Sequence, residues 1–181
     1  MSALGYTLFG TSLGRCGMAW RSDGGITAVQ LPEDDDERTA ARLLRAAPKG
    51  TQLAGAPAWV AQAMARVVAV LNGAKDDLAD LPLDMTGVPP FHQQVYAAAR
   101  AIPPGRTLTY GEVAAHLGQP GASRAVGQAL GHNPFAPVVP CHRVLAAGSR
   151  SGGFSANGGV DTKLRMLLME GAQFGDQPEL F

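Results

Sequence analysis

A cysteine and a histidine stand side by side at residues 141 and 142, after the apolar run PVVP and before the glycine-rich segment GSRSGGFSANGG. A free cysteine titrates at about pH 8.5, so only a small fraction is thiolate at neutral pH. A nucleophilic cysteine therefore needs a base, a helix N-terminus or positive charge nearby. His142 offers the base and Arg143 the charge, which makes Cys141 a candidate nucleophile.

The geometry of this dipeptide sets a further requirement. Adjacent side chains of a straight strand point to opposite faces, so contact between Cys141 and His142 needs a bend or a bridging water. Pro140 favours such an irregular backbone. A base works better when a third group orients it. We expect Glu170, late in the segment VDTKLRMLLME, to accept a hydrogen bond from one His142 nitrogen while the other nitrogen faces the sulfur.

The cysteine count argues against a metal site and against a disulfide framework. Cys16 and Cys141 lie far apart, and neither has a CxxC or HxxxH partner. We therefore expect no metal and a cytoplasmic protein. A displacement by a thiolate needs no cofactor either, and we expect none. The N-terminal residues do not look like a secretory signal, and no apolar stretch reaches the roughly 20 residues that span a bilayer, so we expect no membrane contact.

The net charge of zero conceals an uneven distribution. Residues 91–170 carry seven cations and three anions, whereas residues 1–90 carry eight cations and ten anions. A basic segment beside acidic ones can meet a phosphate backbone while the acidic parts face away. On its own this is a weak indication of nucleic-acid binding.

The elements that must position these residues begin with three short apolar or alternating runs at 6–9, 16–20 and 26–31, separated by glycines and turn residues. This spacing predicts a small antiparallel sheet. A helix with an acidic start is predicted from PEDDDERTAARLLRAAP.

A further helix is predicted over 58–71, ended by Asn72-Gly73, and a strand plus linker over 75–90. Composition changes near Pro89-Pro90, which suggests a domain boundary there. We expect domains at 1–88 and 89–172, followed by a tail at 173–181.

Three helices are predicted in the second domain. The first covers 91–102, and the second begins after Thr109, where Glu112 completes a capping box. The third covers 122–130 and follows the turn Gln119-Pro120-Gly121, so the last two form a helix-turn-helix pattern.

The last of these helices, ASRAVGQALG, is narrow. Ala125 and Gly127 are small, and Arg124 is its one long basic side chain. A reader of the major groove usually carries several long polar side chains, whereas a slim helix suits the minor groove, where one arginine can insert where a base has left the stack. The alternative is that the small residues let this helix pack closely on a neighbour.

Ordered blocks between residues 81 and 170 resemble one family, the methylated-DNA–protein-cysteine methyltransferases, or O6-alkylguanine-DNA alkyltransferases. The blocks are LPLDMTG, FHQQVY, IPPGRTLTYGEVA, RAVGQALGHNP, VPCHRV, GGFS and GGVDTKLRMLLMEG. The first half matches only loosely. With this resemblance the expected fold class is α+β, with a small antiparallel, RNase H-like sheet domain and a mainly helical domain that contains the helix-turn-helix.

The resemblance implies that the protein flips an O6-alkylated guanine, chiefly O6-methylguanine, out of double-stranded DNA and moves the alkyl group irreversibly onto Cys141. His142 would take the thiol proton through a water, and Glu170 would hold His142. Asn133 resembles the hinge between the recognition helix and the active-site loop. Tyr110 resembles the tyrosine that displaces the target phosphate and later gives a proton to the departing guanine.

The resemblance also implies which residues contact DNA and which line the substrate pocket. Arg124 resembles the finger that fills the gap left by the flipped base, on a helix whose Ala125 and Gly127 would face DNA. Residues expected to line the pocket are Val144, Gly152, Phe154 and Ser155, the last with a backbone donor for the guanine O6. Phe154 replaces a tyrosine found in some members, the FSANGG loop is longer than a compact form, and Gly152 would leave the pocket open to alkyl groups larger than methyl. We expect a monomer.

Three other functions stay open at this stage. A relative that binds alkylated DNA without transfer would carry another residue at position 141. A helix-turn-helix regulator would need long polar side chains on the recognition helix. A cysteine hydrolase would show turnover rather than a single event.

Overall fold

Residues 3–146 and 159–172 are described in this computed structural model. The chain divides into two units: the first holds residues 1–74, 78–86 and 134–138, and the second holds 75–77, 87–133 and 139–181. The predicted division at residues 88 and 89 stays a prediction.

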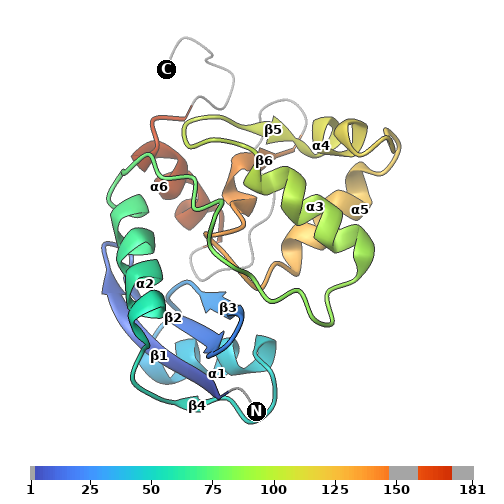
Figure 1. Ribbon diagram of the computed structural model, residues 1–181. Helices are drawn as coiled ribbons and strands as arrows, with labels where there is room; N and C mark the ends of the chain where they lie inside the picture. The colour runs from blue at the N-terminus through green and yellow to red at the C-terminus, as the bar shows by residue number, and fades with distance from the viewer. Residues whose placement is uncertain (1–2, 147–158, 173–181) are drawn as a thin grey trace. The chain divides into compact units, whose positions relative to one another are not determined.

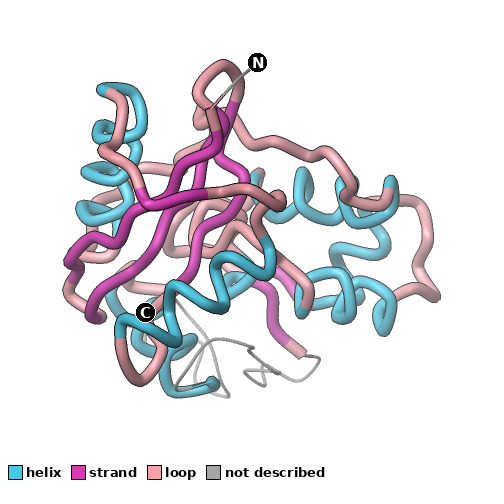
Figure 2. Tube along the Cα trace, turned by 90° about the horizontal axis from the view of Figure 1, so that it is seen from below, coloured by secondary structure: helices cyan, strands magenta, loops and turns pink. Residues whose placement is uncertain are grey.

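An antiparallel meander of three strands is the centre of the first unit. The strands are β1 (Leu4–Thr11), β2 (Gly14–Arg21) and β3 (Gly25–Gln30). They run side by side in Figure 2, with β2 between its neighbours. This confirms the sheet predicted from the alternating runs and their turn residues.

A fourth strand joins this sheet in an orientation that the sequence does not predict. β4 (Gln52–Leu53) pairs parallel to β1, which gives the order β3-β2-β1-β4. Two exposed residues carry no periodic pattern, so nothing in the sequence marks this strand. The strand predicted within 75–90 is reduced to a single bridge between Leu83 and Ile26.

Helix α1 (Asp36–Ala46) covers this sheet, packing against β2 and β3. The side chain of Asp35 accepts a hydrogen bond from the Arg38 backbone N–H, so the acidic run caps the helix start as predicted. Leu43 is buried against Ala19 and Ala28 of the sheet. Helix α2 (Ala58–Val70) follows, close to the predicted bounds.

The second unit is mainly helical. Its elements are α3 (Pro90–Arg100), β5 (Leu108–Thr109), α4 (Tyr110–His116), α5 (Ser123–Gly131), a 3-10 turn η1 (Cys141–Arg143), β6 (Val144–Leu145) and α6 (Gly159–Met169). The parallel pair β5–β6 was not predicted. The mixture of a sheet-based and a helical unit confirms the α+β class.

The predicted helix-turn-helix is formed by α4 and α5, which pack against each other (Figure 1). The capping box of α4 is present: Thr109 Oγ1 accepts from the Glu112 N–H, and Glu112 Oε1 accepts from the Thr109 N–H, both at 3.0 Å. Helix α5 also packs on α3, where the Tyr96 hydroxyl donates to the Ala129 carbonyl at 2.7 Å. Within the described ranges, no helix has the length and hydropathy to cross a membrane.

Candidate active site

The 3-10 turn η1 begins at Cys141 and supplies the bend that the sequence requires. The Cys141 N–H donates to the Val139 carbonyl at 2.8 Å, and the Arg143 N–H donates to the Pro140 carbonyl at 2.9 Å. The chain then enters β6 at Val144. In this turn Cys141 and His142 no longer alternate as they would in a strand, and Cys141 is 9% exposed.

His142 and Glu170 are in direct contact. His142 Nε2 lies 2.7 Å from Glu170 Oε1, and both side chains are buried. A ring nitrogen that faces a carboxylate carries the proton, which leaves Nδ1 with a lone pair. Among the described residues Nδ1 is buried and has no hydrogen-bond partner. His142 therefore has an unused acceptor, as a general base requires.

The sequence suggested Arg143 as a source of positive charge for the thiol, but in the structure Arg143 contacts Glu170. Rather than lying beside the thiol, its guanidinium donates to both Glu170 oxygens, with Nη2 2.7 Å from Oε1 and Nε 3.0 Å from Oε2. Its Nη1 donates to the Ile102 carbonyl at 2.8 Å, at the end of α3. Arg143 thus fixes the carboxylate that orients His142.

Burial and the neighbouring charges shift the pKa values of Glu170 and His142. Burial alone would raise the pKa of Glu170, but the hydrogen bonds and charges of His142 and Arg143 outweigh it and lower that pKa to about 2. Burial lowers the pKa of His142 more than Glu170 raises it. At neutral pH the cluster therefore holds a carboxylate and a neutral imidazole.

Cys141 is under opposing influences. Burial raises the pKa of its thiol and outweighs a hydrogen bond from Asn133, the charge of Lys163 and the backbone N–H groups of Cys141 and His142, which lower it. Asn133 follows α5 and also donates from Nδ2 to the Val139 carbonyl at 2.9 Å. Asn133 therefore connects the end of α5 to the segment that carries the cysteine, the position expected of a hinge.

Lys163 is a member of the site that the sequence analysis missed. It lies on α6, is fully buried, and donates from Nζ to the Val144 carbonyl at 2.8 Å. Its Nζ also lies 5.8 Å from the centre of the Tyr110 ring. The buried residues of α6 and its end fall at 163, 166, 167 and 170, the spacing of one helix face. A lysine on that apolar face was the available signal.

Tyr110 and Val144 also lie at this site. Tyr110 is the first residue of α4, and burial together with the charge of Cys141 raises the pKa of its phenol. Val144 is fully buried and offers its carbonyl to Lys163. The structure thus brings together five predicted residues: Asn133 and Tyr110 lie near the Cys141 thiol, and Glu170 contacts His142, the neighbour of Cys141 in the chain.

Of the residues predicted to meet DNA, Tyr110 begins α4 and the other three lie on α5. Arg124 is exposed, and Ala125 and Gly127 are partly exposed. A Cβ placed on Gly127 would meet no described atom within 4 Å. Packing against the described residues therefore does not require glycine at position 127.

Gly152, Phe154 and Ser155 lie outside the described residues. In the part of the chain that is described, no group of three or more His, Cys, Asp or Glu side chains could hold a metal ion.

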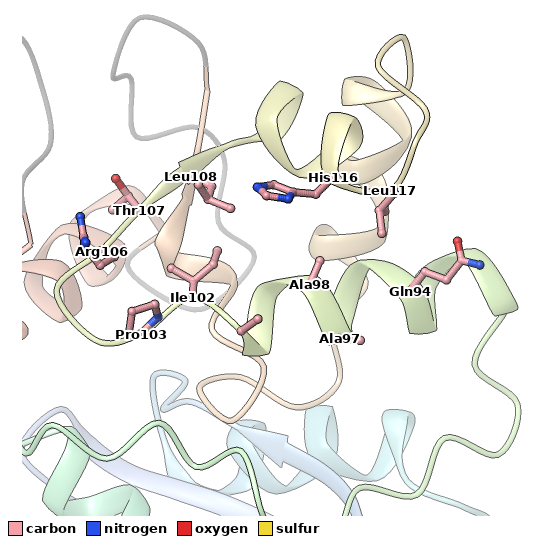
Figure 3. Close-up of a pocket in the computed structure, with 11 residues that line it drawn as sticks. Gln94, Ala97, Ala98, Ile102, Pro103, Arg106, Thr107, Leu108, His116 and Leu117 are labelled. Atoms are coloured by element: carbon pink, nitrogen blue, oxygen red, sulfur yellow. The ribbon is translucent and has the colours of Figure 1, made fainter.

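A separate cavity of about 640 Å³ lies between α3, the loop that follows it, and α4. Figure 3 shows His116 and Leu108 above the small side chain of Ala98 on α3. The lining residues are Gln94, Ala97, Ala98, Ala101, Ile102, Pro103, Arg106, Thr107, Leu108, His116 and Leu117. None of them was predicted for the site, but the cavity adjoins it: the Ile102 carbonyl accepts from Arg143, and Leu108 pairs with Val144.

Comparison with known proteins places this arrangement in a family. Residues 90–172 match the model of the 6-O-methylguanine DNA methyltransferase, DNA binding domain. A solved structure of Mycobacterium tuberculosis OGT in complex with DNA superposes with a TM-score of 0.74 at 30% identity, covering 98% of this chain and 99% of that chain. The shared fold and the matching domain define the class: an α+β protein whose helical unit matches this DNA binding domain and contains a helix-turn-helix.

Two curated relatives extend the comparison. The regulatory protein ada of Salmonella typhimurium is 40% identical over 165 residues, which is 91% of this chain and 45% of that protein. A methylated-DNA–protein-cysteine methyltransferase of Mycolicibacterium paratuberculosis is 48% identical over 91 residues, 50% of this chain and 53% of that protein. The chain spans about half the length of the curated relatives it matches. The chain belongs to the O6-methylguanine-DNA methyltransferase family.

Proposed function

We propose that this protein repairs double-stranded DNA that contains O6-alkylguanine, chiefly O6-methylguanine, by moving the alkyl group to its own Cys141 in a single event. The observation that carries the proposal is the contact between His142 Nε2 and Glu170 beside a buried cysteine, which leaves His142 Nδ1 as an unused acceptor. The family membership of the chain and the DNA bound to the Mycobacterium tuberculosis protein support the choice of substrate.

The proposed reaction is a displacement at the alkyl carbon. His142 takes the thiol proton through a water, and the thiolate sulfur attacks. The S–C bond forms while the bond between carbon and the guanine O6 breaks, and its electron pair leaves with the guanine. Tyr110 then donates a proton to the guanine, which stabilises the leaving group. No metal or cofactor takes part.

We propose that access to the base comes from extrusion through the minor groove. Extrusion costs a few kcal/mol. The exposed Arg124 would occupy the gap, and the small side chains of Ala125 and Gly127 would let α5 approach the groove. Contacts of this kind read few base edges, which suits repair in any sequence context. The monomeric state and the cytoplasmic location stay predictions.

The decisive experiment is the intact mass of the protein after incubation with a duplex that contains O6-methylguanine. We expect a gain of one methyl group per molecule, on the peptide that contains Cys141. Cys141→Ala should bind the duplex without gaining mass, and Cys16→Ser should behave as the unaltered protein because Cys16 is buried in the sheet. Binding without transfer would favour a non-transferring relative, and repeated turnover of an ester or amide would favour a hydrolase.

A further inference from the structure

Two histidines from different helices lie against each other in the second unit. His92 is in the first turn of α3, and His132 directly follows α5, which packs on α3 (Figure 1). The centres of their rings are 6.1 Å apart, and the ring planes meet at 28°. His132 is exposed and His92 is partly exposed, so solvent reaches both rings. The proposed reaction gives neither residue a role.

A hydrogen bond fixes which nitrogen of the His132 ring carries the proton. Nδ1 lies 2.8 Å from the Gln128 carbonyl oxygen, which can only accept, so Nδ1 carries the proton and Nε2 keeps a lone pair. The His132 backbone N–H donates to the same carbonyl at 3.2 Å. Histidines that bind metal ions usually donate their other ring N–H to a carbonyl or a carboxylate, which fixes the orientation of the ring. His132 is therefore arranged as an Nε2 ligand.

His92 contacts both His132 and a buried tyrosine. Its ring meets the Tyr96 ring edge-on, with the ring centres 6.1 Å apart and the planes at 60°. The Tyr96 hydroxyl donates to the Ala129 carbonyl, so the residue that supports His92 is anchored to the helix that ends at His132. Within residues 3–146 and 159–172 the His92 side chain makes ring contacts with these two residues, which leaves its nitrogens available to a ligand.

The separation of the two histidine rings suits a shared metal ion. A histidine nitrogen binds Zn²⁺ at about 2.0–2.1 Å, so the centres of two imidazole rings on one ion lie about 5–6 Å apart, with the larger value at wide angles between the ligands. The observed 6.1 Å is close to the upper value. Imidazole nitrogens suit Zn²⁺, Ni²⁺ and Cu²⁺, whereas Mg²⁺ prefers oxygen ligands. The pair therefore favours a divalent transition metal.

We propose that His92 and His132 together bind one divalent transition-metal ion, which links the start of α3 to the end of α5 next to Asn133. In the described ranges no third histidine, cysteine or carboxylate joins them, so water completes the coordination and the ion exchanges with solvent. The prediction of no metal came from the spacing of the cysteines, and the two histidines are too far apart in the chain to form a spacing motif. This site goes beyond the proposed function, because it does not include Cys141.

The test measures Zn²⁺ binding by isothermal titration calorimetry, with protein that carries no polyhistidine tag. We expect one ion per molecule in the unaltered protein and an affinity lower by about tenfold or more in His92→Gln and in His132→Gln, since each variant loses one of two ligands. His116→Gln removes an exposed histidine from α4 and should bind Zn²⁺ as before. Cys141→Ala should do the same, which excludes the thiol as the ligand. No binding to the unaltered protein, or equal affinity in either variant of the pair, would overturn the inference.

A second measurement compares several ions and follows thermal unfolding. We expect Cu²⁺ to bind more tightly than Ni²⁺ or Zn²⁺, and Mg²⁺ not to bind. An ion that binds only the folded protein raises the unfolding temperature. Ni²⁺ should therefore raise the unfolding temperature of the unaltered protein and leave that of the double variant His92→Gln, His132→Gln unchanged. A similar rise in both proteins would contradict the site.

The active site serves as an internal control for these variants. The rate at which iodoacetamide modifies Cys141, without DNA and without metal, should be the same in the histidine variants as in the unaltered protein. None of these measurements uses DNA. A protein that binds the metal through His92 and His132 but takes no methyl group from damaged duplex would count against the proposed function and not against the metal site.

Discussion

One oxygen of Glu170 serves two buried side chains: Oε1 lies 2.7 Å from His142 Nε2 and 2.7 Å from Arg143 Nη2. Because Arg143 already balances the carboxylate, His142 can stay neutral and keep its Nδ1 lone pair. Without Arg143, the carboxylate would favour an imidazolium, which has no lone pair to accept a proton. The ion pair therefore helps to keep His142 in the form that a general base needs.

Replacing Glu170 by glutamine tests this arrangement. The amide cannot supply the charge that orients His142 and balances Arg143. We expect the rate of methyl transfer in a single event to fall about a hundredfold. Leaving the Arg143 charge buried should also lower the free energy of unfolding by about 3–5 kcal/mol. Rapid-quench kinetics and denaturant unfolding measure the two effects. The exposed carboxylate of Glu37 gives the control, since Glu37→Gln should alter neither.

Stability at acidic pH follows from the same carboxylate. Its pKa falls from 4.5 to about 2 on folding, so the unfolded chain binds more protons within that range. The contribution of Glu170 to stability is therefore complete above about pH 4.5 and is lost as the pH falls towards 2. We expect the unfolding temperature of the unaltered protein to drop steeply across this range. Glu170→Gln should show a shallower slope, and equal slopes would show that other carboxylates govern the acid response.

The sequence predicts most of the elements because their signals are local. Alternation with glycine turns gives β1 to β3, and the capping box of Thr109 and Glu112 marks the start of α4. The strands β4, β5 and β6 escape prediction because two residues cannot show a period. Their pairing depends on the tertiary fold.

Some contacts of the candidate site could likewise be predicted from the sequence, and others could not. The contact of His142 with Glu170 could be expected because a base needs an orienting group. The role of Arg143 could not, because nothing in the sequence indicates that a second cation shares the carboxylate that orients the base. Lys163 carried a readable signal, its place on the buried face of α6, but a charged residue on an apolar face can also snorkel to the surface. Only the structure shows whether the Lys163 ammonium is buried or reaches the surface, because the sequence does not give the burial of a side chain.

Gly105 holds the loop before β5 close to the end of α6. Its φ is +89°, a conformation that a side chain disfavours, and an added Cβ would lie 3.2 Å from the Glu170 carbonyl. We expect Gly105→Ala to lower the free energy of unfolding by about 1–2 kcal/mol and to slow transfer modestly by displacing Glu170. Gly50 also has a positive φ, but a Cβ there meets no described atom within 4 Å. Gly50→Ala should therefore be destabilising without slowing transfer.

Arg124 is the residue expected to act on DNA and not on the thiol. It is exposed on α5, and no contact with Cys141 is required for its proposed role. Arg124→Ala should weaken binding to damaged duplex about tenfold and slow repair of duplex DNA. The iodoacetamide rate of Cys141 should stay unchanged. The exposed Arg106, on the loop before β5, provides a control for the loss of one charge. If Arg106→Ala weakens binding as much, the effect is one of net charge, and Arg124 has no special position.

Substitutions at Gly127 test separately whether α5 is narrow for packing or for DNA binding. A Cβ at Gly127 meets no described atom within 4 Å, so Gly127→Ala should raise the free energy of unfolding by about 0.5–1 kcal/mol through helix propensity. Gly127→Leu should fold as well, but its side chain projects from the face proposed to enter the minor groove. We therefore expect duplex affinity to fall at least tenfold while iodoacetamide still modifies Cys141 normally. Ala97→Leu adds similar bulk at an exposed position on α3 and should leave affinity unchanged. Full duplex affinity in Gly127→Leu would mean that this face of α5 does not enter the groove.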